Sequence, residues 1–216
     1  MNFSAVFLGQ SIIKYQVPLE VFVGLNELYE TQKKHLPNAN KQLSGKIQDE
    51  VSLFYSGPTN KKMHVHSHVS EDILKWFYYI FDHYLKWNKT QDYKIDISSV
   101  WVNEMKAGDY NPVHIHQGKL YTGLSSVMIL KLPKDMGPEI ARPDEPMNGQ
   151  LQFMGSASGQ FVKSDYSPEM KIGDFYVFPY DIRHVVYPFT NKKEKRRTLV
   201  CNCDVSYDPV KSRTAQ

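Results

Sequence analysis

Short apolar segments separated by turn residues fill the second half of the chain, and they constrain the fold more than any other feature. Eight such segments follow residue 94, rich in Val, Ile, Tyr and Phe and separated by Gly, Pro or Asp. This composition and length predict strands rather than helices. The expected strands cover residues 95–105, 110–117, 124–132, 150–154, 160–164, 174–179, 183–188 and 196–206. Such a succession of short strands favours a jelly roll, in which two sheets enclose one core.

Two amphipathic helices are predicted before these strands. The first covers residues 18–34 and begins at a proline, which suits the start of a helix. The second covers residues 70–87, with Ser70 as its expected N-cap and two acids in the first turn, where the helix dipole favours them. A short strand is expected over residues 5–15, and the polar segment 36–68 is expected to be irregular.

The chain is expected to form a single domain. Its 216 residues are close to the usual size of one domain, and 41% of them are hydrophobic, which is enough for a core. Two helices followed by strands predict an α+β domain over residues 1–216. Its helical N-terminal part would cover about residues 1–94, and its jelly-roll core about residues 95–206.

Charge and cysteine content argue against several classes of protein. The net charge is +3, from 26 basic and 23 acidic residues, so there is no strong signal for a nucleic-acid partner. No stretch reaches the roughly 18 apolar residues that span a membrane, and the start lacks the basic region of a signal peptide. Cys201 and Cys203 are too close in sequence for an unstrained disulfide and are expected to be packed thiols. We therefore expect a cytoplasmic protein without a membrane partner.

Three histidines form the first candidate site. His114 and His116 lie two residues apart in a predicted strand, so their imidazoles are expected to face the same side. His184 stands at the start of a later predicted strand. A mononuclear iron site needs three protein ligands on one face, which leaves positions for a bidentate acid and dioxygen. A second group, His64, His66 and His68, precedes a helix cap in a polar segment and is expected at the surface.

An arginine on the last predicted strand is the second candidate. Arg196, Thr198 and Asn202 are expected to share one face of this strand, whereas Arg197 faces the other. A buried arginine beside a hydroxyl is well suited to holding a carboxylate. An error of one residue in the register would exchange Arg196 and Arg197, and a structural salt bridge remains the alternative role for Arg196.

The ordered combination of these segments resembles a known family. The resemblance covers roughly residues 95–205 and rests on Trp101-Val102-Asn103, Asn111-Pro112-Val113-His114-Ile115-His116, Gly173-Asp174-Phe175-Tyr176-Val177-Phe178-Pro179 with His184, and Arg196-Arg197-Thr198 ending at Asn202. These segments are similar to the 2-oxoglutarate- and Fe(II)-dependent oxygenases common in marine bacteriophages. The family implies a double-stranded β-helix core and Fe(II). It also implies decarboxylation of 2-oxoglutarate to succinate and CO2, coupled to oxidation of a second substrate.

The resemblance assigns His114 and His184 to the two histidine positions of the metal site. His116 stands where the wider superfamily has Asp or Glu, so the expected metal ligands are three imidazoles. Zn or Cu would also accept three imidazoles. Asp109 and Glu104 are the nearest alternative carboxylates for the third ligand position.

The resemblance also assigns the cosubstrate contacts. Arg196 stands at the position that binds the distal carboxylate, with Thr198 as its hydroxyl companion. Tyr110, beside the histidine strand, and Asn202 are further candidates for contact with 2-oxoglutarate. Packing at the rim or the end of a strand is the alternative role for both.

These features together predict an iron- and 2-oxoglutarate-dependent dioxygenase that hydroxylates an unidentified substrate. The substrate would be a small molecule or a peptide, with a prolyl or other peptide side chain suggested by analogy, and a viral origin would place the enzyme in the host cytoplasm. The proline-rich loop over residues 133–149 is expected to be a lid. Two alternatives remain, a jelly-roll module that binds a ligand without turnover and a three-histidine, cupin-like dioxygenase that does not use 2-oxoglutarate.

Overall fold

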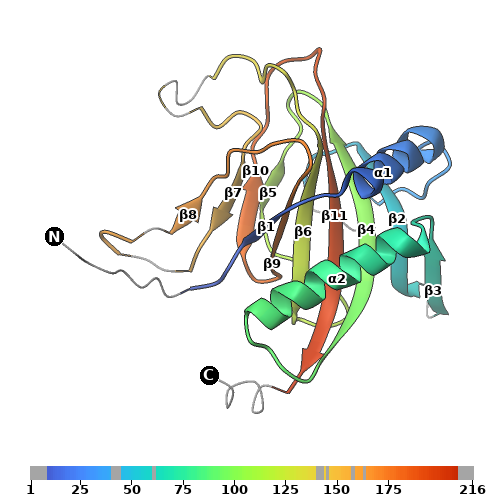
Figure 1. Cartoon of the computed structure of the whole chain (residues 1–216). Helices are drawn as coiled ribbons and strands as arrows, with labels where there is room; N and C mark the ends of the chain where they lie inside the picture. Colours follow the sequence, from blue (N-terminus) through green and yellow to red (C-terminus); the bar gives the residue numbers. More distant parts are fainter. Residues whose placement is uncertain are drawn as a thin grey trace.

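A computed structural model describes residues 9–39, 45–59, 62–139, 144, 146–156, 159–162 and 164–208. Over these residues the chain forms two helices, α1 (Leu19–Gln32) and α2 (Glu71–Trp87), and two β-sheets (Figure 1). The seven strands of the major sheet are, in spatial order, β1 (Ile13–Gln16), β9 (Asp174–Pro179), β6 (Gly123–Lys131), β11 (Arg196–Tyr207), β4 (Tyr93–Met105), β2 (Asp49–Thr59) and β3 (Lys62–Ser67). The four strands of the minor sheet are β5 (Asn111–His114), β10 (Arg183–Val186), β7 (Leu151–Met154) and β8 (Asp165–Tyr166).

The two helices cover one face of the major sheet. Figure 1 shows α2 crossing in front of β6, β11 and β4. Val102 of β4 and Leu199 of β11 are fully buried in one apolar cluster with Leu25 of α1 and Phe77 of α2. Because side chains alternate between the faces of a strand, the neighbours of these residues are directed to the opposite face.

That opposite face packs against the minor sheet. Trp101 of β4 and Val200 of β11 share a second apolar cluster with Leu151 and Phe153 of β7. Two sheets therefore enclose one core while the helices cover the outside. This arrangement confirms the predicted jelly roll.

Both predicted helices are present, and they begin and end within about two residues of the expected bounds. The hydroxyl of Ser70 accepts a hydrogen bond from the backbone N–H of Ile73 at 3.4 Å, so the predicted N-cap is confirmed. In the described part of the chain, neither helix is long and apolar enough to cross a membrane.

The strand prediction was wrong at three places. The segment 36–68 is not irregular, since β2 and β3 form a hairpin on the edge of the major sheet. The N-terminal part is therefore not only helical. The short strand expected over residues 160–164 is instead β8, and the opening strand is limited to β1, with residues 1–8 outside the described part.

Candidate metal centre

Two neighbouring strands of the minor sheet bring two of the histidines together. His114, the last residue of β5, lies directly opposite His184 of β10 in the antiparallel register. His116 follows two residues beyond the end of β5, where its backbone N–H donates a hydrogen bond to the carbonyl of Tyr180 at 2.9 Å. This hydrogen bond keeps the chain in place after the strand ends, so that the third imidazole reaches the other two.

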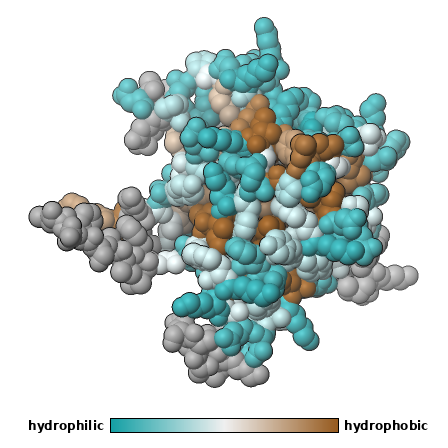
Figure 2. Space-filling model, in the orientation of Figure 1, coloured by the Kyte–Doolittle hydropathy of each residue, from teal (hydrophilic) through white to brown (hydrophobic). Residues whose placement is uncertain are grey.

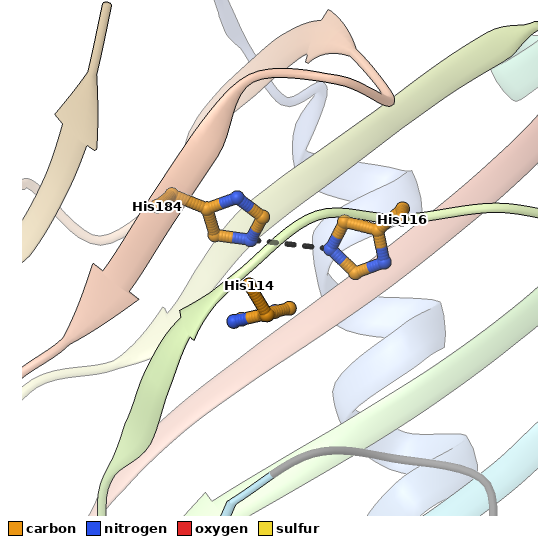
Figure 3. Close-up of side chains that lie close together, drawn as sticks. All are labelled: His114, His116 and His184. Atoms are coloured by element: carbon orange, nitrogen blue, oxygen red, sulfur yellow. Dashed lines mark hydrogen bonds between the residues drawn. The ribbon is translucent and has the colours of Figure 1, made fainter.

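The three imidazoles are turned toward one another (Figure 3). One ring nitrogen from each lies within 4.8 Å of the others, and His116 Nε2 is 3.1 Å from His184 Nε2. Metal–nitrogen bonds of about 2.0–2.1 Å are compatible with this spacing around a single cation. Among the described residues, no carboxylate joins this cluster.

Backbone carbonyls fix the protonation of two rings. The Nδ1–H of His114 donates to the Pro112 carbonyl at 2.7 Å, and the Nδ1–H of His184 donates to the Ile182 carbonyl at 3.1 Å. A carbonyl can only accept, so each Nδ1 carries the proton and each Nε2 keeps its lone pair. This is the usual arrangement of a metal-binding histidine and its supporting acceptor.

Asn202 supports the third ring. Its amide nitrogen is 3.3 Å from His116 Nδ1, while its amide oxygen is buried without a hydrogen-bond partner. A half-turn of the amide group places the oxygen next to Nδ1, where it accepts the Nδ1–H. That orientation satisfies the buried oxygen and leaves the lone pair of His116 on Nε2, toward His184.

The cluster is uncharged at neutral pH. Burial lowers the pKa of His184 to about 3, with a further contribution from His114 nearby. Burial and the two neighbouring imidazoles lower the pKa of His116 well below its ordinary value, and burial lowers that of His114. Three neutral imidazoles without a shared proton therefore suit a bound metal cation.

Arg196 is a buried charge without an acid partner among the described residues. Its side chain is 1% exposed, and Nη1 and Nη2 lie 3.7 and 3.5 Å from the sulfur atoms of Met105 and Met170. Its Nε has no hydrogen-bond partner among the described groups. Burial lowers the pKa of Arg196 to about 10, so the guanidinium remains charged at neutral pH. An uncompensated buried charge is costly, so a buried guanidinium is normally found with a partner.

Residues 99–202 match the family model described as putative 2OG-Fe(II) oxygenase, where 2OG is 2-oxoglutarate.

The matched range contains the three histidines and Arg196. The family match and the three-histidine cluster support Fe(II) and 2-oxoglutarate as the cofactors, in agreement with the sequence prediction. The marine bacteriophage type is a finer assignment than this match gives.

Solved structures with the same fold include several 2OG oxygenases. A prolyl-4-hydroxylase from Pseudomonas putida shares 14% identity, with a TM-score of 0.53 over 91% of this chain and 92% of that one. A 2OG-Fe(II) family oxidoreductase from Burkholderia pseudomallei shares 15% identity, with a TM-score of 0.55 over 88% of this chain and 84% of that one. A prolyl hydroxylase from Trichoplax adhaerens, in complex with a hypoxia inducible factor peptide, shares 13% identity, with a TM-score of 0.52 over 96% of this chain and 87% of that one. At these identities the likeness establishes the fold, and no curated protein sequence matches the chain.

The other candidates from the sequence lie elsewhere. Arg197 faces the helices, where Glu104 accepts hydrogen bonds from its Nε at 2.9 Å and from its Nη2. Glu104 is thus engaged away from the histidine cluster. Asp109 Oδ2 accepts the backbone N–H of Lys106 at 2.9 Å, which closes a turn. Tyr110 is 41% exposed and does not line the cleft beside the histidines, so the structure does not bring it into the site.

A cleft of about 780 Å³ opens beside the histidines. His114, His116 and His184 line it together with Thr198 and Asn202, and the opposite wall comes from β2 and β4. None of the described residues of the segment 133–149 lines the cleft.

The sequence prediction missed the β2 wall of this cleft. Glu50 and Ser52 line the cleft, while Val51 and Leu53 belong to the core under the helices. This alternation of polar and apolar residues is the signal of a half-buried strand, and it could have identified β2. It was obscured because the inward-facing positions are polar.

The second histidine group does not form a metal site in the described part of the chain. His66 Nε2 lies 3.1 Å from the hydroxyl of Ser52, and the rings of His66 and His68 are 5.8 Å apart. The side chain of His64 is outside the described residues.

Proposed function

We propose that this protein is a 2OG- and Fe(II)-dependent dioxygenase that hydroxylates a second substrate and releases succinate and CO2. The observation that carries the proposal is the cluster of His114, His116 and His184, whose ring nitrogens lie within 4.8 Å of one another and which is neutral at pH 7. The unpaired guanidinium of Arg196, on the face of β11 that packs against the minor sheet, supports a carboxylate-bearing cosubstrate.

Each residue of the site has a distinct task in this proposal. The three histidines hold the iron, which when bound supplies the activation of dioxygen. Arg196 and Thr198 bind the distal carboxylate of 2-oxoglutarate and orient it. Asn202 holds the ring of His116 through Nδ1. The apolar residues around the cluster, including Phe178 and Phe153, exclude water.

The substrate in this proposal is a peptide side chain, with a prolyl residue as the first candidate. Two of the structures that share the fold are prolyl hydroxylases by name, and one of them is a complex with a peptide. We also propose, from the sequence resemblance, that the enzyme is of the marine bacteriophage type and acts in the cytoplasm of the host.

An anaerobic titration with Fe(II) and 2-oxoglutarate tests the proposal. The protein should develop the visible charge-transfer absorption of an iron-bound 2-oxo acid and should form succinate when air is admitted. Arg196→Met should lose 2-oxoglutarate binding and still load iron. Iron loading without any 2-oxoglutarate effect would favour a cupin-like dioxygenase, and no metal binding at all would favour a module that only binds a ligand.

A further inference from the structure

The cleft contains a group of buried polar atoms without hydrogen-bond partners among the described residues. They are Glu50 Oε1, Trp101 Nε1, Asn103 Oδ1, Asn111 Oδ1 and Asn202 Oδ1. None of the five side chains is more than 9% exposed. Buried polar atoms are normally paired, so a concentration of unpaired atoms around one cleft indicates a ligand that satisfies them. A half-turn of the Asn202 amide satisfies its oxygen, which leaves four unpaired atoms, of which Glu50 Oε1 is the only one on an ionisable side chain.

Glu50 lies beside the proposed cosubstrate position and not in it. Thr198 of β11 pairs with Asn103 of β4, which in turn pairs with Glu50 of β2. Adjacent strands are about 4.8 Å apart, so Glu50 lies about 10 Å across the sheet from Thr198. A 2-oxoglutarate held by Arg196 and Thr198 therefore leaves Glu50 facing the remaining space of the cleft, where a second substrate has room.

Among the described residues, the one unpaired atom in this part of the cleft that belongs to an ionisable group is the carboxylate oxygen of Glu50. The amides of Asn103 and Asn111, which can each turn an oxygen toward a donor, and the N–H of Trp101 are also unpaired. Glu50 makes no ion pair with a described lysine or arginine. Burial, and then the negative charge of Asp109, raise the pKa of Glu50 to about 7. A positively charged donor that enters the cleft would offset both effects.

We propose that Glu50, assisted by Asn103 and Asn111, forms a subsite for a cationic N–H donor, an ammonium or guanidinium group, on the second substrate. This inference rests on the proposed dioxygenase function, because that function assigns the rest of the cleft to the metal and 2-oxoglutarate. It narrows the substrate to molecules or peptides with a basic group close to the oxidised position.

Matched probes test this subsite in the anaerobic protein loaded with Fe(II) and 2-oxoglutarate. The probes are N-acetyl-arginine methylamide and N-acetyl-citrulline methylamide, which have almost the same shape but differ in charge. Calorimetric titration should show the arginine probe binding about tenfold more tightly, as expected for one charge-assisted hydrogen bond. Glu50→Gln should abolish this preference without loss of iron or 2-oxoglutarate binding.

Asp49→Asn is the matched control. Asp49 precedes Glu50 on the same strand, and its carboxylate pairs with Lys106 at 2.8 Å on the surface. The control should keep the full preference for the arginine probe. A thermal melt verifies that Glu50→Gln is folded. If Glu50→Gln does not fold, Asn103→Ala takes its place, because it is expected to weaken the same preference for the arginine probe.

Equal binding of the two probes by the wild-type protein would overturn the subsite, as would a preference that survives in both Glu50→Gln and Asn103→Ala. Failure of the dioxygenase function has a different signature. In that case the charge-transfer absorption is absent before any probe is added.

Discussion

Arg196 and Arg197 are adjacent in sequence and both buried, yet they differ in every contact. Arg197, on the helix face of β11, bonds Glu104, reaches Glu30 at 2.5 Å, and has its guanidinium 4.2 Å from the ring centre of Tyr29. Arg196, on the other face, contacts two thioethers and no acid of the described part of the chain. The fold therefore satisfies one charge completely and leaves the other without an acid partner among the described residues. Under the proposed function, the presence of acid partners, and not burial, distinguishes the structural arginine from the one that binds the cosubstrate.

The same contrast extends to the two faces of the major sheet. On the helix face, the charge of Arg197 beside the apolar cluster is paired with Glu104 and Glu30. On the cleft face, side-chain oxygens of Glu50, Asn103 and Asn111 are unpaired. Mutations should thus separate into those that change folding and those that change binding.

The largest effect is expected from His184→Ala. This change removes one of three ligands, so the affinity for Fe(II) should fall by more than the 10–100-fold typical of losing an outer-shell partner. Metal content after dialysis against Fe(II) measures it. The free energy of unfolding of the metal-free protein should fall only by the cost of the cavity that this buried side chain leaves. A variant that keeps full metal content would contradict the metal centre.

Replacing each of the two arginines separately by methionine tests the contrast between Arg196 and Arg197 directly. Arg197→Met leaves Glu104 with Lys195 as its one cationic partner among the described residues, so the free energy of unfolding should fall by about 3 kcal/mol. Arg196→Met should leave the stability of the cofactor-free protein unchanged or raise it, because it removes an unpaired buried charge. Urea denaturation of both variants measures the difference. Equal destabilisation by the two changes would break the comparison.

Asn202 should have an intermediate effect on metal binding. Asn202→Leu removes the acceptor next to His116 Nδ1, and Fe(II) affinity should fall about 10–100-fold. Asn202→Asp keeps an oxygen at that position and should retain most of the affinity. Competition with a metal-binding dye measures both variants, and equal loss in the two would show that Asn202 acts only through packing.

The smallest effect is expected on the stability of the protein at acidic pH, through the carboxyl group of Glu104. Burial opposes ionisation of Glu104, but hydrogen bonds from Lys195 and Arg197 outweigh it and lower the pKa of its carboxyl group. The unfolded chain then binds more protons below pH 4.5, so the stabilisation is complete above that pH and is lost as the pH falls through the lower folded value. Glu104→Gln should flatten the acid limb of stability measured by denaturant titration. An unchanged slope would show that the pair contributes little.

Sequence alternation predicted the two faces of β11 because a strand with period two has few other arrangements. The convergence of His114 with His184 required the register of β5 and β10, which the order of motifs suggested through family resemblance but spacing alone does not determine. Tyr110 was chosen because it adjoins the histidine strand, but its side chain is 41% exposed and is not among the residues that line the cleft. Strand β2, with Glu50, was not predicted because a strand with polar residues on its inward face resembles a loop in the sequence.

The position of His116 beyond the end of β5 has a consequence for stability. The segment that follows it is tied to β11 before the chain enters the major sheet as β6: Asp204 accepts the backbone N–H of Lys119 at 2.9 Å, and the Thr122 hydroxyl donates to the Val205 carbonyl at 2.7 Å. An ion shared by His116 and His184 would therefore cross-link the segment after β5 to β10 at the edge of the minor sheet. Each tenfold rise in free metal above its dissociation constant would then add about 1.4 kcal/mol to the resistance to unfolding.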